Sequence, residues 1–180
     1  MIFWTGCKIM YTLREIEKKD LVYINKWRNN PDLIMWLGAP FRYINIDVDE
    51  EWYASYMSSR SNTIRCSIID MNSNETVGLV SLTNIDYINQ SAIFHIMIGE
   101  LKNQGCGVGT FAIKSILKHA FCNVNLRRIE LSVLADNTRA QHVYEKIGFR
   151  REGMLRKAYF KNGEFVDVYI YAILRDEYSI

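Results

Sequence analysis

The sequence predicts an α/β protein of the α+β type, with one mixed β-sheet and helices on its faces. Runs rich in β-branched residues between 63 and 98, separated by turn residues, indicate antiparallel strands. From 91 to 148 the order becomes strand, helix, strand, helix. Near the end, Asn162-Gly163 separates two apolar runs and indicates a two-residue hairpin. This order of elements fits a single sheet covered by helices.

The first half is predicted to place short helices between a first strand and a β-hairpin. The expected ranges are a strand at 9–14, a helix from Leu21 to Trp27 capped by Asp20, a turn opened by Pro31, a helix after Asp47, and strands at 63–70 and 76–84. In the helix after Asp47, Trp52, Tyr53 and Tyr56 fall on one face. This spacing predicts that the aromatic face is directed at the core.

The second half is predicted to continue the sheet. The expected ranges are strands at 91–98 and 128–134, helices after Gly109 and after Asp136 or Asn137, and hairpin strands at 155–160 and 165–173. Alternation along 91–98 puts Phe94, Ile96 and Ile98 on one face of the sheet. It puts His95 and Met97 on the other.

Length and composition exclude several classes of protein. The 180 residues fit one domain, 1–180, and the net charge of +2 is too small to indicate nucleic-acid binding. Four cysteines without C-x-x-C spacing and three scattered histidines argue against a metal site and for reduced thiols in the cytoplasm. The short apolar start has no basic n-region, so neither a signal peptide nor a membrane association is expected.

A glycine-rich loop joins the strand at 91–98 to the next helix. Gly105, Gly107 and Gly109 can adopt unusual backbone angles, and the first N–H groups of the helix lack internal partners. Such a corner can bind a pyrophosphate. It is not a Walker loop, because no Gly-Lys-Ser/Thr follows, and the spacing is not Gly-x-Gly-x-x-Gly. By itself it could also be a turn without a ligand.

A second motif runs from 137 to 149. By periodicity alone, Tyr144 is a core residue of the amphipathic helix. Its place beside the edge of a strand allows another role, because a phenol can donate a proton to a leaving thiolate.

Taken together, the two motifs resemble the GNAT superfamily of acetyl-CoA-dependent N-acetyltransferases. The matching residues are Gln104, Gly107 and Gly109, followed by Asn137, Ala140, Tyr144, Gly148 and Phe149. The opening Leu13-Arg14 and the tail from Glu152 to Val168 are similar to the branch that acetylates ribosomal-protein N-termini and spermidine. The resemblance covers nearly the whole chain and implies a mostly antiparallel mixed sheet with helices on both faces.

The resemblance also implies a set of cofactor-binding residues. The main chain of Gln104, Gly105, Cys106, Gly107, Val108, Gly109 and Thr110 would bind the pyrophosphate of acetyl-CoA, and that of Ile96, Met97 and Ile98 would pair with the pantetheine arm. Asn137 would contact the cofactor, with Arg139 and Lys146 near its phosphates or arm. Cys106 stands where the family often has a lysine or arginine, so a positive charge is lost there.

In catalysis the resemblance implies direct transfer, with Tyr144 as the general acid. A base must deprotonate the acceptor amine. Spermidine acetyltransferases often carry a glutamate where this chain has Ile93. His95 is the nearest titratable side chain on the strand and is the candidate base, although a structural histidine or a water chain would also fit.

The acceptor is expected to be a primary amine on a small molecule or a peptide. Aromatic and charged residues of the variable first half, such as Trp27, Arg28, Trp36 and Tyr53, and the segment near Asp86, could line its pocket. A polyamine or amino-sugar acetyltransferase, a non-catalytic acyl-CoA sensor and a nucleotide-binding module are the alternatives. The resemblance further suggests a homodimer.

Overall fold

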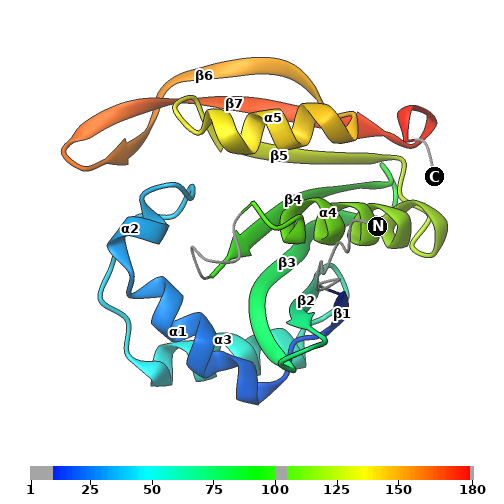
Figure 1. The fold of residues 1–180 in the computed structure, drawn as a ribbon. Coiled ribbons are helices and arrows are strands. Elements are labelled where there is room, and N and C mark those ends of the chain that lie inside the picture. Colours follow the sequence, from blue (N-terminus) through cyan, green and yellow to red (C-terminus); the bar gives the residue numbers. More distant parts are fainter. Residues whose placement is uncertain (1–9, 100–104, 179–180) are drawn as a thin grey trace, which may run out of the picture.

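The computed structural model describes residues 10–99 and 105–178, and these ranges contain a seven-stranded sheet with helices on both faces (Figure 1). The strands are β1 (Tyr11–Glu15), β2 (Ile64–Asp70), β3 (Glu75–Asp86), β4 (Ser91–Ile98), β5 (Arg128–Leu134), β6 (Arg150–Lys161) and β7 (Glu164–Leu174). The α-helices are α1 (Leu21–Arg28), α2 (Pro31–Ile34), α3 (Ile46–Ser58), α4 (Val108–Cys122) and α5 (Thr138–Ile147). Short 3₁₀ turns occupy Lys18–Asp20 and Arg175–Glu177.

The sheet order is β1-β2-β3-β4-β5-β7-β6, and the single mixed sheet expected from the sequence is confirmed. Only β4 and β5 run parallel, and every other neighbouring pair is antiparallel. The hairpin at Asn162-Gly163 is confirmed: both residues have positive φ, 48° and 89°, as a type I′ turn requires.

Two apolar clusters lie on opposite faces of this sheet. Residues of α4 pack with Ile68, Val80, Phe94 and Leu131 of the strands. On the other face, α1 and α3 pack Trp27 and Tyr56 against each other, with Leu79 and Met97 at the margin. The alternation expected for β4 is therefore confirmed: Phe94 faces α4 and Met97 faces α1 and α3.

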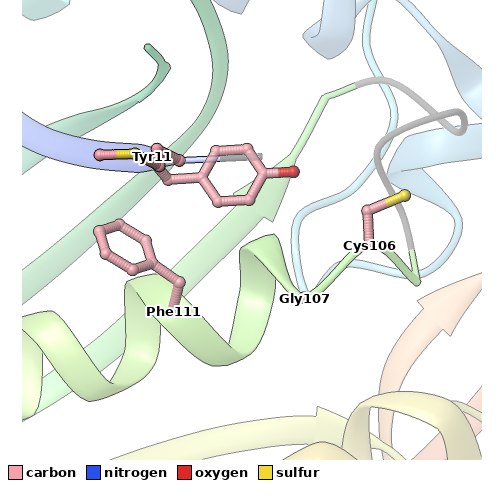
Figure 2. A pocket seen from close by; sticks show the side chains of 5 residues that line it. Tyr11, Cys106, Gly107 and Phe111 are labelled. Carbon is pink, nitrogen blue, oxygen red and sulfur yellow. The ribbon is translucent and has the colours of Figure 1, made fainter. Parts of the chain in front are cut away.

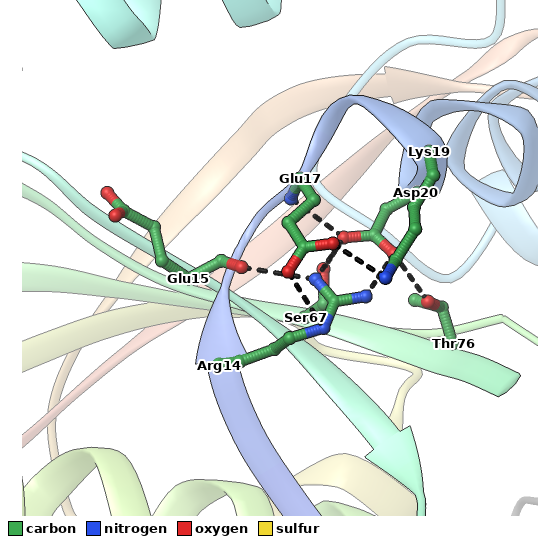
Figure 3. Close-up of polar contacts among 7 residues, drawn as sticks. All are labelled: Arg14, Glu15, Glu17, Lys19, Asp20, Ser67 and Thr76. Atoms are coloured by element: carbon green, nitrogen blue, oxygen red, sulfur yellow. Dashed lines mark hydrogen bonds and ion pairs between the residues drawn. The ribbon is translucent and has the colours of Figure 1, made fainter. Parts of the chain in front are cut away.

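A buried carboxylate ties the start of α1 to three strands (Figure 3). The carboxylate of Asp20 accepts two hydrogen bonds of 2.7 Å from the Arg14 guanidinium, one of 2.6 Å from Ser67 Oγ and one of 2.7 Å from Thr76 Oγ1. The backbone N–H of Glu17 donates to it as well, at 2.8 Å. These partners hold the pKa of Asp20 down at about 2, against the opposing effect of burial. We call Asp20, Arg14, Ser67 and Thr76 the Asp20 cluster.

Three local predictions need correction. Asp20 precedes α1, but its side chain makes no capping bond to that helix because it is taken up by the Asp20 cluster. The third helix starts at Ile46, after Asn45 rather than Asp47. Strand β6 starts at Arg150, not at 155, because register shifts near Gly153 and between Leu155 and Tyr159 interrupt its alternation.

Of the helices in the described ranges, none has the length and apolar character needed to cross a membrane.

Candidate functional site

The site begins where the two parallel strands separate. Strand β4 pairs with β3 from Ile98 back to Ser91, but with β5 only at Ser91, Ala92 and Ile93. Beyond Ile93 the β5-facing edge of β4 makes no ladder with another described strand. This edge includes Ile96, Met97 and Ile98, so an extended ligand could pair with their main chain as an additional strand.

The glycine loop follows this open end of β4 and leads into α4. Gly107 is the N-cap of α4 with φ of 85°, and the first intrahelical bond runs from Phe111 N to Gly107 O. The N–H groups of Val108, Gly109 and Thr110 therefore precede the helical ladder. A Cβ placed on Gly107 or Gly109 would meet no heavy atom within 4 Å, so the loop borders open space. Gln104 lies outside the described residues.

The start of α5 lies against the glycine loop. A Cβ on Gly105 would be 3.4 Å from Nη2 of Arg139, which places this guanidinium beside the loop. Asn137 is the N-cap of α5: its Oδ1 accepts from Ala140 N at 3.1 Å, and its Nδ2 donates to Trp36 O at 3.2 Å. Lys146 is exposed in the last turn of α5, roughly 10 Å further along the helix from Arg139 at 1.5 Å per residue.

Tyr144 lies on the buried face of α5, next to the point where β4 leaves β5. Its ring is 8% exposed and packs edge-on against Phe94 of β4 and against Phe149, with centroids 6.3 and 5.8 Å away. Burial raises the pKa of Tyr144 to about 12. The phenol is therefore protonated at neutral pH and able to act as a donor.

His95 lies on the opposite face of β4, two residues beyond the last pair with β5. Its Nε2 is 2.9 Å from Thr83 Oγ1 of β3. Partial burial, and to a smaller extent the positive charge of Arg65, lower the pKa of His95. A lowered pKa keeps the imidazole neutral at neutral pH, which is the form that can accept a proton.

An apolar hollow of about 310 Å³ adjoins the glycine loop on the β1 side (Figure 2). It is lined by Met10, Tyr11, Cys106, Gly107 and Phe111. The rings of Tyr11 and Phe111 are 5.9 Å apart, and Tyr11 directs its hydroxyl toward the side on which Cys106 lies. The loop that precedes α4 therefore has an apolar wall on this side.

Of the residues expected to line an acceptor pocket, Trp27 and Tyr53 share the apolar cluster of α1 and α3, while Trp36 and Asp86 lie apart from it. Trp27 is fully buried, and Arg28 forms an ion pair with the buried Asp49. Trp36 is 44% exposed next to Asn137, on the side of the glycine loop. Asp86 organises the β3–β4 turn, accepting from Ile88 N and Asn89 N, at the opposite end of β4 from that loop.

Sequence reasoning missed Arg65 on β2. Its guanidinium carbon lies 4.6 Å from the ring centroid of Trp52 and 5.6 Å from that of Tyr56, both on α3. Its buried Nε atom has no hydrogen-bond partner. The signal that could have revealed it is a charged residue in the middle of the strand-forming run at 64–69.

Comparison with known proteins agrees with this geometry. Residues 11–150 match the family model of the acetyltransferase (GNAT) domain. The chain belongs to the GNAT acetyltransferase family. The resemblance stated from the sequence is thereby confirmed.

The relatives include enzymes with named substrates. The spermidine N(1)-acetyltransferase of Vibrio cholerae is 35% identical over 168 residues, which cover 93% of this chain and 94% of that protein. The crystal structure of spermidine N-acetyltransferase from Vibrio cholerae in complex with CoA and spermine has a TM-score of 0.87 at 34% identity, covering 93% of this chain and 97% of that one. The ribosomal-protein-serine acetyltransferase of Escherichia coli K12 is 30% identical over 102 residues, 57% of this chain and 56% of that protein.

The protein is an N-acetyltransferase that uses acetyl-CoA as its cosubstrate to acylate an amine. Three features fit this cosubstrate: the first amides of α4 have no acceptor within the helix, Gly107 and Gly109 border open space, and part of the β4 edge pairs with no strand in the described ranges. Among the described residues, no group of three histidine, cysteine or acidic side chains is arranged to bind a metal.

Proposed function

We propose that the acetyltransferase moves the acetyl group directly from acetyl-CoA to a primary amine that approaches β4 from the face covered by α1 and α3. The observation that carries this proposal is the position of β4. Its free edge starts after Ile93 and runs toward the glycine loop, with Tyr144 on one face of the strand and His95 on the other. Residues 1–180 would act as one catalytic domain in the cytoplasm.

In this proposal the glycine loop and β4 bind the cosubstrate. Main-chain N–H groups between Gln104 and Thr110 (Gly105, Cys106, Gly107, Val108 and Gly109 among them) bind the pyrophosphate, helped by the helix dipole of α4. Arg139, beside Gly105, adds a positive charge. The main chain of Ile96, Met97 and Ile98 pairs with the pantetheine arm. Asn137 contacts the cosubstrate while it caps α5, and Lys146 contributes a second, more distant positive charge.

The two side chains that flank β4 would carry the proton transfers. His95 accepts the proton of the incoming amine, directly or through a water, because its lowered pKa keeps it neutral. A main-chain N–H at Ile96, Met97 or Ile98 donates to the thioester oxygen as negative charge develops there. Tyr144 then donates its phenolic proton to the departing sulfur, and solvent restores it.

The acceptor class has two sources of support among the relatives. Relatives named for spermidine suggest a polyamine, and the relative named for a ribosomal protein suggests a peptide N-terminus. A homodimer would be built through the β6–β7 hairpin, which exposes Phe160 and Phe165 near its tip. One solved Vibrio cholerae relative is dodecameric, which supports self-association.

The test is acetyl-CoA-dependent thiol release with a panel of polyamines, amino sugars and short peptides, comparing wild type with Tyr144→Phe. We expect wild type to turn over at least one amine class. We expect Tyr144→Phe to lower kcat by about 10²-fold or more while acetyl-CoA affinity changes little, because only the proton donor is removed.

Tyr171→Phe is the matched control. Tyr171 is another buried tyrosine close to α5, but its hydroxyl donates to Glu145 Oε1 at 2.8 Å, so its loss should affect stability rather than rate. Full activity in Tyr144→Phe would show that Tyr144 is not the general acid. Binding of acetyl-CoA by wild type without acetylation of any amine would favour a non-catalytic sensor.

A further inference from the structure

Arg65 is a half-buried cation on the acceptor side of the sheet with no counter-ion from the described part of the chain. It stacks on Trp52 and lies near Tyr56, whose hydroxyl donates to Glu15 Oε1 instead. Its Nε atom is buried and unpartnered. Burial lowers the pKa of Arg65, with a smaller opposing contribution from Tyr56. An uncompensated, partly desolvated guanidinium binds an incoming anion strongly.

The register of the sheet brings Arg65 to the candidate base. Arg65 pairs with Ser81, and Ser81 pairs with His95, so the three residues form one row across β2, β3 and β4 on the same face. Two strand spacings separate Arg65 from His95, roughly 9.5 Å between their backbones. The positive charge of Arg65 is the second cause, after burial, of the lowered pKa of His95.

The two central strands of this face, β3 and β4, offer no carboxylate to a cationic acceptor. Two carboxylates of the flanking strands are already bonded: Glu130 of β5, level with Ile93, pairs with Arg128, and Glu15 of β1 binds Tyr56 and Arg60. The β3 and β4 side chains around His95 on this face are Leu79, Ser81, Thr83, Ile93 and Met97, none of which is acidic. Two acids of α3 are engaged elsewhere: Asp49 pairs with Arg28 of α1, and Glu50 with Lys18. A polyamine would bring a second positive charge toward Arg65, and like charges at short range repel.

We propose that Arg65 determines acceptor specificity: the acetyltransferase prefers a primary amine that carries a carboxylate close to the amine, and Arg65 binds that carboxylate while His95 faces the amine. This inference rests on the proposed function and names its substrate class. The carboxylate could belong to a free amino acid or to an acidic residue at a peptide N-terminus. Arg65 would bind the carboxylate in the same way in either kind of acceptor.

The experiment compares kcat/KM for acceptors that differ only in this charge. The peptide arm uses Asp-Ala-Ala and Asn-Ala-Ala amides, and the small-molecule arm uses β-alanine and β-alaninamide, with spermidine as the polycation. We expect kcat/KM for the acceptor with the carboxylate to exceed that for the matching amide by about tenfold or more, for the peptides, the small molecules or both. The pair that shows this difference identifies the source of the carboxylate. We expect spermidine to be the poorest acceptor.

Variants of Arg65 then assign the preference to this residue. Arg65→Gln should reduce the preference to about twofold or less, and Arg65→Lys should retain part of it, because a point charge lacks the bidentate geometry. Arg150→Gln is the matched control, since Arg150 lies at the start of β6, pairs with Glu177 and should leave the preference unchanged. Thermal unfolding and acetyl-CoA affinity, measured for each variant, separate a loss of specificity from a loss of fold.

Each outcome decides the question. If spermidine matches or exceeds the acidic acceptors in wild type, the inference is wrong while the proposed function stands. An acidic preference that persists in Arg65→Gln would also overturn it. If acetyl-CoA binds but no amine is acetylated, the proposed function itself fails, and the inference with it. If Arg65→Gln does not fold, the inference is still tested by the acid–amide comparison in wild type and by the preference of Arg65→Lys.

Discussion

Two arginines on neighbouring strands of the same sheet have opposite surroundings. Arg14 of β1 makes two hydrogen bonds to the buried Asp20, whose remaining sites are filled by Ser67, Thr76 and a backbone N–H. Arg65 of β2 has aromatic rings beside it and a buried Nε without a partner. The first charge is neutralised within the fold. The second is left available on the face where an acceptor would bind.

This difference is the basis for assigning a structural role to Arg14 and for proposing a functional one for Arg65. A satisfied ion pair contributes to the folded state and becomes costly when one partner is removed. A charge that has lost part of its solvation without gaining a counter-ion is a cost to folding, and a ligand of opposite charge can offset that cost. Ion pairing and hydrogen bonding, rather than burial alone, therefore distinguish the two arginines.

The largest expected effect comes from removing the partner of Arg14. Asp20→Ala leaves the buried Ser67 and Thr76 hydroxyls without their acceptor. It leaves Arg14 with only Glu17 and the Glu15 carbonyl, so the free energy of unfolding should fall by about 3–5 kcal/mol. Arg65→Met, which removes an unpaired charge, should change it by less than about 1 kcal/mol. Urea unfolding monitored by circular dichroism measures both. Equal losses in the two variants would contradict the comparison.

Lowering the pH is expected to have a smaller effect on the free energy of unfolding. The pKa of Asp20 is held at about 2, below its ordinary value of 3.8, so its stabilisation is present in full above about pH 4. It is lost as the pH falls from about 4 toward 2, and amounts to something on the order of 2 kcal/mol. Urea unfolding at pH 5 and pH 3 should show this loss in wild type.

The control for the pH experiment is Asp20→Asn, which removes the titrating carboxyl group. Other carboxylates also titrate in this range, so the quantity to compare is the difference between wild type and the variant at each pH. We expect this difference to shrink on going from pH 5 to pH 3. An unchanged difference would mean that the Asp20 cluster does not lower the pKa of Asp20.

The smallest expected effect is a displacement of the pH–rate profile. If His95 is the base, the acidic limb of kcat/KM should lie below the ordinary pKa of histidine, because burial and then Arg65 lower the pKa of His95. Arg65→Gln removes one of these causes, so its limb should move toward higher pH. Full profiles of wild type, Arg65→Gln and His95→Gln measure this. A limb that survives unchanged in His95→Gln would assign the base to another group.

Much of the fold and part of the site could be predicted from sequence because they are encoded locally. Alternation placed β4 and its two faces, the glycines placed the loop before α4, and helical spacing placed Tyr144 on the buried face of α5. The start of β6 was missed because bulges near Gly153 break the period of two on which strand prediction depends.

The remaining features depend on contacts between distant segments. Asp20 looked like a helix cap, and only the meeting of β1, β2 and β3 makes it the centre of a buried cluster. Arg65 is one charged residue in a strand until α3 places Trp52 over it. The separation of β4 from β5 after Ile93 is likewise a property of pairing, which no single segment reveals.

The end of β4 also constrains how this sequence can change over evolutionary time. The indole of Trp27 lies so close to Gly99 that a Cβ there would be 1.8 Å from the ring. A lineage that keeps the tryptophan cannot accept any side chain at 99, and a lineage that gains one must first lose or reduce the indole. The two positions lie far apart in the chain, yet they can drift only as a pair, and each restricts the mutational paths open to the other.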